Sequence, residues 1–538
     1  MTLTGVNIGN WLLLEPWMLA IPTEGSDSFR DQHDILTLLN ERFGPERAGA
    51  FLDTYRAHWF TARDAAIIRG FGMNLVRVPF HYSLLTSDEG PLELRDDAFQ
   101  WLDRAVELAT DAGLYVILDL HGAPGGQSID MPSGRVGQNL LWTSPEHQRR
   151  TAWLWGKISE RYKDHDAVIA YDLLNEPYGD FQTDLSQELI ELMDAVIREV
   201  RSVDESTLVF LPGQLSGIDF YGDPKDRSWD NAGFTEHFYP GIFGNEERSL
   251  RRHARFVACE LAVRRHQLQK SDVPFLVGEI NTIFEWIGGP TLLAEHIKRF
   301  ENEGWMTTMW SYRIHRNDGR LPRDNWTLVA NAEAFAFDVH TMSYEELIET
   351  AERLSVTPLD KDEPFRNELR DRDMDRPGLF PLLPAASIGD VGSSVPGWTI
   401  RGIGGGTPGG SSLSGSTLTL SGGGDDVFGR SDSFVLASHE QSSSASSRTI
   451  AADIIAFDAH HQYAKAGLMV RESDASDAAH ASVHVIPSGE IRMLWRREAS
   501  GSSAERTLAV AALPVRVGIV DAGDRLEAWA ADANGELA

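Results

Sequence analysis

Apolar runs of strand length alternate with amphipathic stretches of helical spacing along the first three fifths of the chain. The runs are rich in branched aliphatic residues, which is typical of parallel strands buried on both faces. The expected strands are residues 3–11, 74–80, 114–124, 168–176, 207–213, 233–239, 275–279 and 305–312. The expected helices include 46–59, 96–113, 145–164, 187–203, 246–269 and 291–304. About eight strands that alternate with helices predict an α/β fold, a closed (β/α)8 TIM barrel.

The pattern changes past residue 380, where helical spacing disappears. Gly and Ser dominate 402–416, which we expect to be a joint between strands, and short strand-like runs follow at 416–422, 432–438, 449–457, 466–473, 481–488, 490–498, 515–521 and 525–531. Such runs predict an all-β sandwich. We therefore expect a barrel domain at 1–385 and a β-sandwich domain at 386–538, with the Pro-rich stretch 376–387 as a link or a strap.

Charge and cysteine content exclude several classes of function. The 538 residues contain 49 Lys and Arg against 80 Asp and Glu, a formal charge of −31, so the surface should repel nucleic acids and anionic membranes. The single cysteine, Cys259, excludes an intrachain disulfide and a thiolate metal cluster, and the pair His460 and His461 is more typical of a loop than of a metal site.

No apolar run has the length of a membrane span, and the N-terminus lacks the pattern of a signal peptide. We favour a cytoplasmic location, with secretion as the alternative if a signal has been removed. The sequence makes no prediction of the oligomeric state.

Polar or aromatic side chains stand where most of the predicted barrel strands finish. They are Arg77, His121, Asn175, Glu176, His237, Tyr239, Glu279 and Trp310. Each alone has a plain reading: a helix cap or turn for Glu176, a buried ion pair for Arg77, satisfied core histidines, or aromatic packing. In a barrel, however, the C-terminal ends of the strands converge on one pocket, so the shared position favours a common site.

Two carboxylates across a barrel mouth suit the hydrolysis of a glycosidic bond, since one can donate a proton and the other can attack the anomeric carbon. Glu176 and Glu279 are the candidate pair. We expect Arg77 and Tyr239 to hold Glu279 anionic, and Glu176 to keep a raised pKa in a drier position. Asn175 is placed to bond a sugar hydroxyl, and Trp310 to stack on a sugar ring.

These motifs resemble glycoside hydrolase family 5. The resemblance rests on NLVRVPF, LDLHGAPGG, LLNEP, EHFY, LVGE and TTMW, in the family's order over about residues 3–312. It implies retention of configuration through a glycosyl-enzyme at Glu279, with Glu176 as acid and then base. It also implies His121, His237 and Tyr239 as substrate-binding residues, and no metal or organic cofactor.

A finer resemblance lies in GVNIGNWLLLEPW at 5–17 and LDLHGAPGGQ at 118–127, which are similar to the exo-β-1,3-glucanase branch of that family. It implies that Glu15 closes the pocket around a terminal sugar; the alternative for Glu15 is a structural salt bridge. Residues 278–286 and 311–320 depart from that branch, which leaves mannose or a disaccharide unit possible as the sugar.

The C-terminal region resembles a concanavalin-like jelly-roll module through DDVFGRSDSFVL at 425–436 and YAKAGLMVRES at 463–473. Such a module either binds carbohydrate or serves packing and solubility. We favour the second reading because the sequence has no evident exposed aromatic row.

The sequence therefore predicts a retaining β-glycosidase that works by double displacement and is exo-acting on a β-glucan, a β-glucoside or a related oligosaccharide. Alternatives within the family are an endo-acting β-glucanase or mannanase and an exo-β-mannosidase or diglycosidase. An inactive carbohydrate-binding protein is the alternative of another class, although a pure binder would not need both glutamates.

Overall fold

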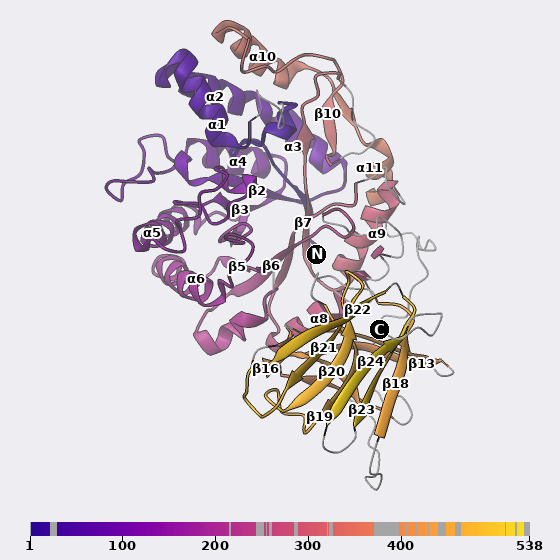
Figure 1. The fold of residues 1–538 in the computed structure, drawn as a ribbon. Coiled ribbons are helices and arrows are strands. Elements are labelled where there is room, and N and C mark those ends of the chain that lie inside the picture. The colour runs from indigo at the N-terminus through magenta and orange to yellow at the C-terminus, as the bar shows by residue number, and fades with distance from the viewer. Residues whose placement is uncertain are drawn as a thin grey trace. The chain divides into compact units, whose positions relative to one another are not determined.

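Eight parallel strands close into a barrel in the first part of the chain, in the order β1 to β8 (Figure 1). The computed structural model describes residues 2–21, 29–214, 217–243, 252–253, 256–257, 261–283, 289–319, 321, 326–370, 398–404, 406–414, 417–424, 426–428, 430–438, 448–457, 464–511, 513–521 and 525–531. The chain forms two compact units, Met1–Ala254 with Gln267–Leu382 and Arg255–His266 with Leu383–Ala538.

The barrel strands are β1 (Thr4–Asn7), β2 (Leu75–His81), β3 (Tyr115–Gly122), β4 (Val168–Asp172), β5 (Leu208–Pro212), β6 (Ala232–Phe238), β7 (Phe275–Ile280) and β8 (Met306–Met309). The barrel closes because β1 pairs with β2 on one side, Gly5 opposite Leu75, and with β8 on the other, Gly5 opposite Thr308. The predicted (β/α)8 fold is confirmed.

Helices surround the strands. They are α1 (Gln32–Phe43), α2 (Pro45–Trp59), α3 (Ala62–Gly70), α4 (Gln100–Asp111), α5 (Pro145–Tyr162), α6 (Ser186–Arg201) and α9 (Gly289–Asn302). A further helix, α8 (Leu261–Ser271), begins in the second unit and ends in the first. Their ends follow local sequence: Ser144 caps α5 by accepting a bond from the His147 amide, with Pro145 in the first helical position. Much of the helix expected at 246–269 lies outside the described residues, and α8 covers its end.

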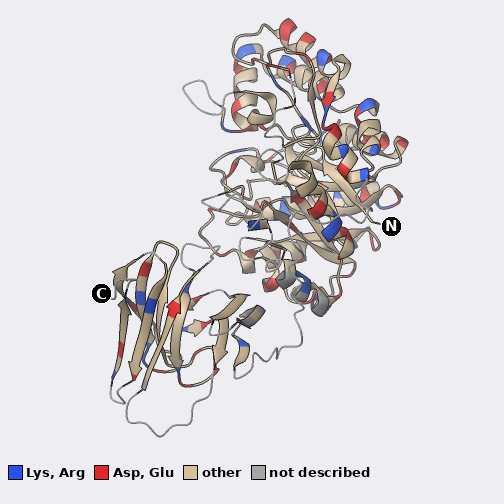
Figure 2. Ribbon diagram, turned by 90° about the vertical axis from the view of Figure 1, so that its right-hand side faces the viewer, with Lys and Arg blue, Asp and Glu red and all other residues tan. Residues whose placement is uncertain are grey.

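Further elements follow β8 in the same unit: a small sheet of β9 (Arg313–Ile314), β10 (Val329–Asn331) and β11 (Leu359–Lys361), with α10 (Tyr344–Val356) and α11 (Glu363–Arg370). Acidic and basic residues alternate over the outer helices (Figure 2). No helix within the described ranges is long and apolar enough to cross a membrane.

An apolar layer fills part of the barrel interior. Leu75, Ile117, Ala170, Phe210 and Leu276 come from five different strands, are fully buried and form one cluster. Because side chains on a strand alternate between its two faces, the residues two positions further along point to the same side. On β2, β3 and β4 those residues are charged, and they form the layer described in the next subsection.

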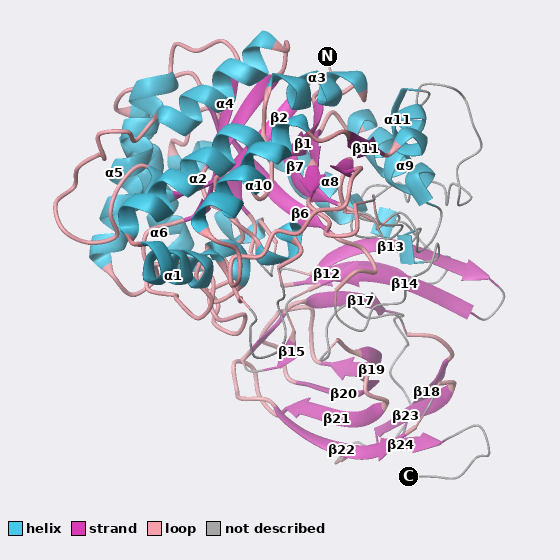
Figure 3. Cartoon of the chain, turned by 90° about the horizontal axis from the view of Figure 1, so that it is seen from above, coloured by secondary structure: helices cyan, strands magenta, loops and turns pink. Residues whose placement is uncertain are grey.

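In the second unit, the described residues of 398–531 form sheets of antiparallel strands (Figure 3). One sheet contains β18 (Arg448–Ile454), β23 (Val515–Asp521) and β24 (Leu526–Ala531); another contains β19 (Ala466–Arg471), β20 (His480–Val485), β21 (Glu490–Arg496) and β22 (Ala504–Val510). The remaining strands pair as β12 (Thr399–Ile403) with β17 (Phe434–Ser438), β13 (Thr407–Ser414) with β14 (Thr417–Gly423) and β15 (Val427–Phe428) with β16 (Ser431–Asp432). Buried valine and isoleucine side chains from both larger sheets form one core, consistent with a β-sandwich.

The finer assignments in this region stay predictions. They are the jelly-roll topology and the domain boundary at residue 385. The Pro-rich stretch 376–387 and the pair His460 and His461 lie outside the described residues.

The expectation that 402–416 is a joint between strands is wrong. Most of this Gly- and Ser-rich stretch belongs to β12 and β13, and β13 forms a hairpin with β14. Backbone pairing needs no apolar side chains, and small residues permit close approach: a Cβ added at Gly406 would lie 2.0 Å from the Phe434 carbonyl oxygen. The missing hydrophobic alternation concealed these strands.

Close backbone contact at Gly5 gives a test of barrel closure. A Cβ added there would lie 1.9 Å from the Leu75 carbonyl oxygen, so we expect Gly5→Ala to lower the free energy of unfolding by about 3 kcal/mol. Gly49 in α2 is the control, because a Cβ there meets nothing within 4 Å. We expect Gly49→Ala to raise stability by about 0.5–1 kcal/mol. Urea unfolding followed by tryptophan fluorescence measures both; equal effects would contradict the packing argument.

Candidate active site

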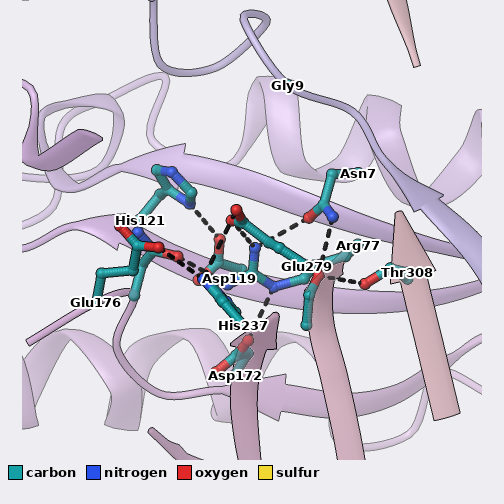
Figure 4. Close-up of polar contacts among 12 residues, drawn as sticks. Asn7, Gly9, Arg77, Asp119, His121, Asp172, Glu176, His237, Glu279 and Thr308 are labelled. Carbon is teal, nitrogen blue, oxygen red and sulfur yellow. Dashed lines mark hydrogen bonds and ion pairs between the residues drawn. The ribbon is translucent and has the colours of Figure 1, made fainter. Parts of the chain in front are cut away.

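A single guanidinium group, that of Arg77, organises the polar layer of the barrel (Figure 4). Arg77 is fully buried in β2, where it points to the same side as Leu75 of the apolar layer. It lies within the strand, so the expectation that it stands at the end of one is wrong. The side chain is long enough to carry its charge toward the C-terminal end of the barrel.

Five polar side chains surround the guanidinium of Arg77, four through hydrogen bonds and one through an ion pair. Nε donates to Asp172 Oδ2 at 2.8 Å, and Nη1 donates to Asn7 Oδ1 at 2.9 Å and Glu279 Oε1 at 3.0 Å. Nη2 donates to Asn175 Oδ1 at 3.0 Å and lies 3.0 Å from Asp119 Oδ1. Burial alone would lower the pKa of Arg77, but the carboxylates Asp119, Asp172 and Glu279 outweigh it and raise the pKa. The cation is therefore permanent.

Glu279, on β7, is held from two sides. Its Oε1 accepts the bond from Arg77, and its Oε2 accepts a bond from the Tyr239 hydroxyl at 2.5 Å. Only 6% of its side chain is exposed. A carboxylate that accepts bonds from a guanidinium and a phenol is fixed in orientation.

Glu176 follows β4 and has a different environment. Its backbone φ is +39°, a strained value for a residue with a side chain, of the kind that collects at functional sites. Burial is the main cause that raises the pKa of Glu176 to about 7. The expectation that Glu176 is the drier of the two glutamates is wrong, because 20% of its side chain is exposed against 6% for Glu279. The two differ in their partners instead.

His237 lies between the two glutamates. Its Nδ1 is 2.8 Å from Glu176 Oε1 and 3.6 Å from Glu279 Oε2. Burial lowers the pKa of His237 to about 4, so the ring is neutral at pH 7. One ligand atom from each of the three residues lies within 4.8 Å of the others. That spacing brings the two carboxylates to face one another, and it would also permit a bound cation.

Asn175, His121 and Trp310 extend the layer toward a ligand. Asn175 accepts from Arg77 through Oδ1, while its buried Nδ2 has no hydrogen-bond partner. His121 Nδ1 lies 2.7 Å from Asp119 Oδ2, and the His121 ring stacks on Trp310 with ring centres 5.4 Å apart and planes at 16°. Burial lowers the pKa of His121 to about 4, so this ring is also neutral.

Glu15 stands just before the short helix Pro16–Leu19 and is 3% exposed. Its Oε2 accepts a bond from Trp17 Nε1 at 2.7 Å, and its Oε1 has no hydrogen-bond partner. Burial is the main cause that raises its pKa to about 8. Within the described part of the chain no cation pairs with it, so the structural salt bridge weighed for Glu15 is not found there.

The sequence profile of the Cellulase family, glycosyl hydrolase family 5, matches residues 47–317. The chain belongs to glycosyl hydrolase family 5. The matched range contains both facing glutamates and Arg77, whereas Asn7 and Glu15 precede it.

Named relatives of this family 5 chain come from fungi. A beta-xylosidase of Phanerodontia chrysosporium is 32% identical over 45% of this chain and 49% of its own length. A probable glucan 1,3-beta-glucosidase A of Aspergillus clavatus is 33% identical over 54% of this chain and 66% of its own length. The chain thus spans about half to two thirds of these relatives. The crystal structure of rutinosidase from Aspergillus niger matches with 16% identity and a TM-score of 0.45, over 58% of this chain and 90% of that one.

Sequence reasoning missed several members of this family 5 site: Asn7, Asp119, Asp172 and Thr308. Asn7 Nδ2 donates to the Gly278 and Met309 carbonyls, and Thr308 Oγ1 donates to the Gly278 carbonyl. Three of these residues contact Arg77 directly. The available signal was a polar residue at an inward position of an otherwise apolar strand, such as Asp119 two positions before His121.

The Arg77 cluster makes stability depend on pH in a defined way. Burial raises the pKa of Asp119 to about 7 and that of Asp172 to about 6, against the opposing charge of Arg77. Carboxyl groups with raised folded-state pKa values contribute stability below their unfolded pKa and lose it as pH rises through the folded value. Removal of Arg77 makes this loss of stability with rising pH larger, because Arg77 opposes the rise in the pKa of Asp119 and Asp172.

We therefore expect Arg77→Met to lower the free energy of unfolding by about 3–5 kcal/mol at pH 8, and by less at pH 5, where the carboxyls can hold protons. Urea unfolding at both pH values measures the difference. Arg316→Met, which removes an exposed arginine paired with Asp318, should show a small effect and no such trend. An equal loss at pH 5 and pH 8 for Arg77→Met would contradict the account.

Proposed function

We propose that this chain is a retaining β-glycosidase, exo-acting on a β-glucan, a β-glucoside or a related oligosaccharide. The observation that carries the proposal is the facing pair Glu176 and Glu279, with ligand atoms within 4.8 Å. Carboxyl groups about 5–5.5 Å apart are typical of retaining enzymes, whereas inverting enzymes leave about 6.5–9.5 Å for a water molecule.

The unequal partners of the two glutamates support unequal roles. Glu279, held by Arg77 and Tyr239, attacks the anomeric carbon, while Glu176 gives its proton to the departing glycosidic oxygen. The carbon–oxygen bond breaks and a glycosyl ester forms on Glu279. Glu176, now a carboxylate, takes a proton from water, which attacks the same carbon and frees Glu279. A Glu176 pKa of about 7 suits both halves of this cycle.

Other side chains of the site supply the sugar contacts in this proposal. The free Nδ2 of Asn175 donates to the hydroxyl beside the anomeric carbon. Trp310, backed by the stacked His121 ring, receives the apolar face of the sugar. His237 orients Glu176 through its 2.8 Å contact.

Exo action is supported by Glu15 and by the relatives. A buried carboxyl oxygen without a partner is suited to the hydroxyls of a terminal sugar. Relatives named probable glucan 1,3-beta-glucosidase and beta-xylosidase are both named for β-glycosidase activities. Endo-acting β-glucanase or mannanase and exo-β-mannosidase or diglycosidase remain the alternatives within the family, and an inactive carbohydrate-binding protein the alternative outside it.

We assign no metal to the reaction, although Glu176, His237 and Glu279 could ligate one. The expected chemistry needs Glu279 as a free nucleophile and Glu176 as a proton donor, and a cation bound to both would block these roles. We further propose residues 1–385 as the catalytic domain and 386–538 as an accessory domain for packing or solubility, with carbohydrate binding as its alternative.

Substitution of the two glutamates tests their separate roles. We expect Glu279→Ala to lower hydrolysis of every aryl β-glycoside by about 10⁴-fold or more. Glu176→Ala should cost about 10²–10⁴-fold with disaccharides but far less with dinitrophenyl glycosides, whose leaving group needs little protonation. In the wild type kcat/KM should fall as pH rises through about 7, and Glu176→Ala should lose this limb. Equal slowing of all substrates would refute the acid role.

Product analysis tests the mode of attack. Incubated with a soluble β-glucan, an exo-acting enzyme releases one small sugar from the first minutes, whereas an endo-acting one yields a ladder of oligomers. We expect the single product and a retained anomeric configuration, measured by chromatography and by proton NMR of the first product. An early ladder would favour the endo-acting alternative.

A further inference from the structure

The candidate site holds more acidic than basic side chains. Among the described residues, five acidic side chains converge there and face one guanidinium, that of Arg77. They are Glu15, Asp119, Asp172, Glu176 and Glu279. That guanidinium is already engaged by four hydrogen bonds and by the ion pair with Asp119. The neighbouring rings of His121 and His237 are neutral, so no described side chain at the site offers a free cation to a ligand.

A further carboxylate, Asp130, stands at the mouth of the barrel. It lies on the loop after β3, is exposed, and its Oδ1 accepts a bond from the Met131 amide at 2.8 Å. The preceding residue is tied to the loop after β4, since the Ile129 amide donates to the Gly179 carbonyl at 2.9 Å, three residues beyond Glu176. No ion pair neutralises Asp130 within the described ranges.

Asp130 is also within electrostatic reach of two groups in the pocket. Burial is the main cause that raises the pKa of Glu15 and of Glu176, and the negative charge of Asp130 adds to the rise in both. Glu176, the proposed acid, protonates the leaving group of the glycoside, so that leaving group lies next to Glu176. The charge of Asp130, which acts on Glu176, will therefore also act on a charged substituent of the leaving group.

Resting on the proposed function, we propose that the site selects against anionic glycosides and that Asp130 is a specificity-determining residue, favouring a cationic over an anionic leaving group. A carboxylate substituent entering this mouth meets the exposed carboxylate of Asp130 and a cluster of acidic groups behind it, whose one described cation, Arg77, is already engaged. An ammonium substituent is attracted instead. In a water-exposed mouth at low salt, the two should differ by about tenfold in kcat/KM.

The test uses two aryl β-glycosides of one sugar whose leaving groups have matched pKa values, one with a trimethylammonium and one with a sulfonate substituent. The readout is the ratio of kcat/KM for the cation to that for the anion. We expect a wild-type ratio of about ten at low salt that falls toward one at about 0.5 M salt, since salt screens exposed charges. Asp130→Asn keeps a side-chain oxygen that can accept the bond from the Met131 amide but removes the charge. It should bring the low-salt ratio within about threefold of one.

Asp111→Asn is the matched control. It makes the same change of net charge at the C-terminal end of α4, the end of the barrel opposite the site, and should keep the wild-type ratio. An unchanged ratio in Asp130→Asn, an equal fall in Asp111→Asn, or a ratio that ignores salt would overturn the inference. These outcomes leave the hydrolysis of neutral glycosides, and hence the proposed function, intact.

A second readout separates the two proposals if no glycoside is hydrolysed. The dissociation constants of the same two compounds, measured by quenching of tryptophan fluorescence, should show the same preference in the wild type and its loss in Asp130→Asn. Binding with that preference but without turnover supports the inference and refutes the proposed hydrolysis. Binding without the preference, or no binding, refutes the inference.

Discussion

The polar half of the barrel interior depends on one buried charge. Taking a guanidinium out of water costs several kcal/mol, and the cost is recovered only if every donor finds an acceptor in good geometry. Arg77 approaches that condition with four hydrogen bonds and one ion pair, to partners on β1, β3, β4 and β7 or just beyond β4. It therefore fixes Glu279 directly, Asn175 through its amide oxygen, and the stack of His121 on Trp310 through Asp119. Removing the cation would leave three buried carboxylates without a counter-ion.

The same interaction explains how two glutamates a few ångströms apart can differ. The sequence predicts that Glu176 is the more buried of the two, but Glu279 is the more buried one. Solvent exposure therefore does not explain the difference. Glu279 receives a guanidinium and a phenol, whereas the polar contact recorded for Glu176 comes from a neutral histidine. A raised pKa for Glu176 then follows from burial without a cation of its own. The difference between the two glutamates follows from their partners, and Glu176 also has a strained backbone, with φ of +39°.

The sequence predicted those features that side-chain pattern controls. Mostly apolar runs predicted all eight barrel strands, and polar groups at or just beyond their ends marked Glu176, Glu279, Asn175 and His237 as candidates. Pattern could not reveal Asn7 or Asp172, because a single polar residue in an apolar strand is explained only by its partner across the barrel. It also missed β13, whose Gly and Ser residues pair with β14 through the backbone. In both cases the missing information was a contact between distant segments.

The buried carboxyl of Glu15 limits which ligands the site can bind favourably. Its carboxyl is buried beside other acids and has one indole as a partner, so ionising it in the empty pocket is unfavourable and its pKa rises to about 8. Sugar hydroxyls that donate to Oε1 would offset this cost, whereas an anionic ligand would increase it. A pocket that is destabilised by its own acids when empty gains most from a neutral, hydroxyl-rich ligand. That electrostatic condition favours an uncharged glycoside independently of the likeness between this chain and named glycosidases.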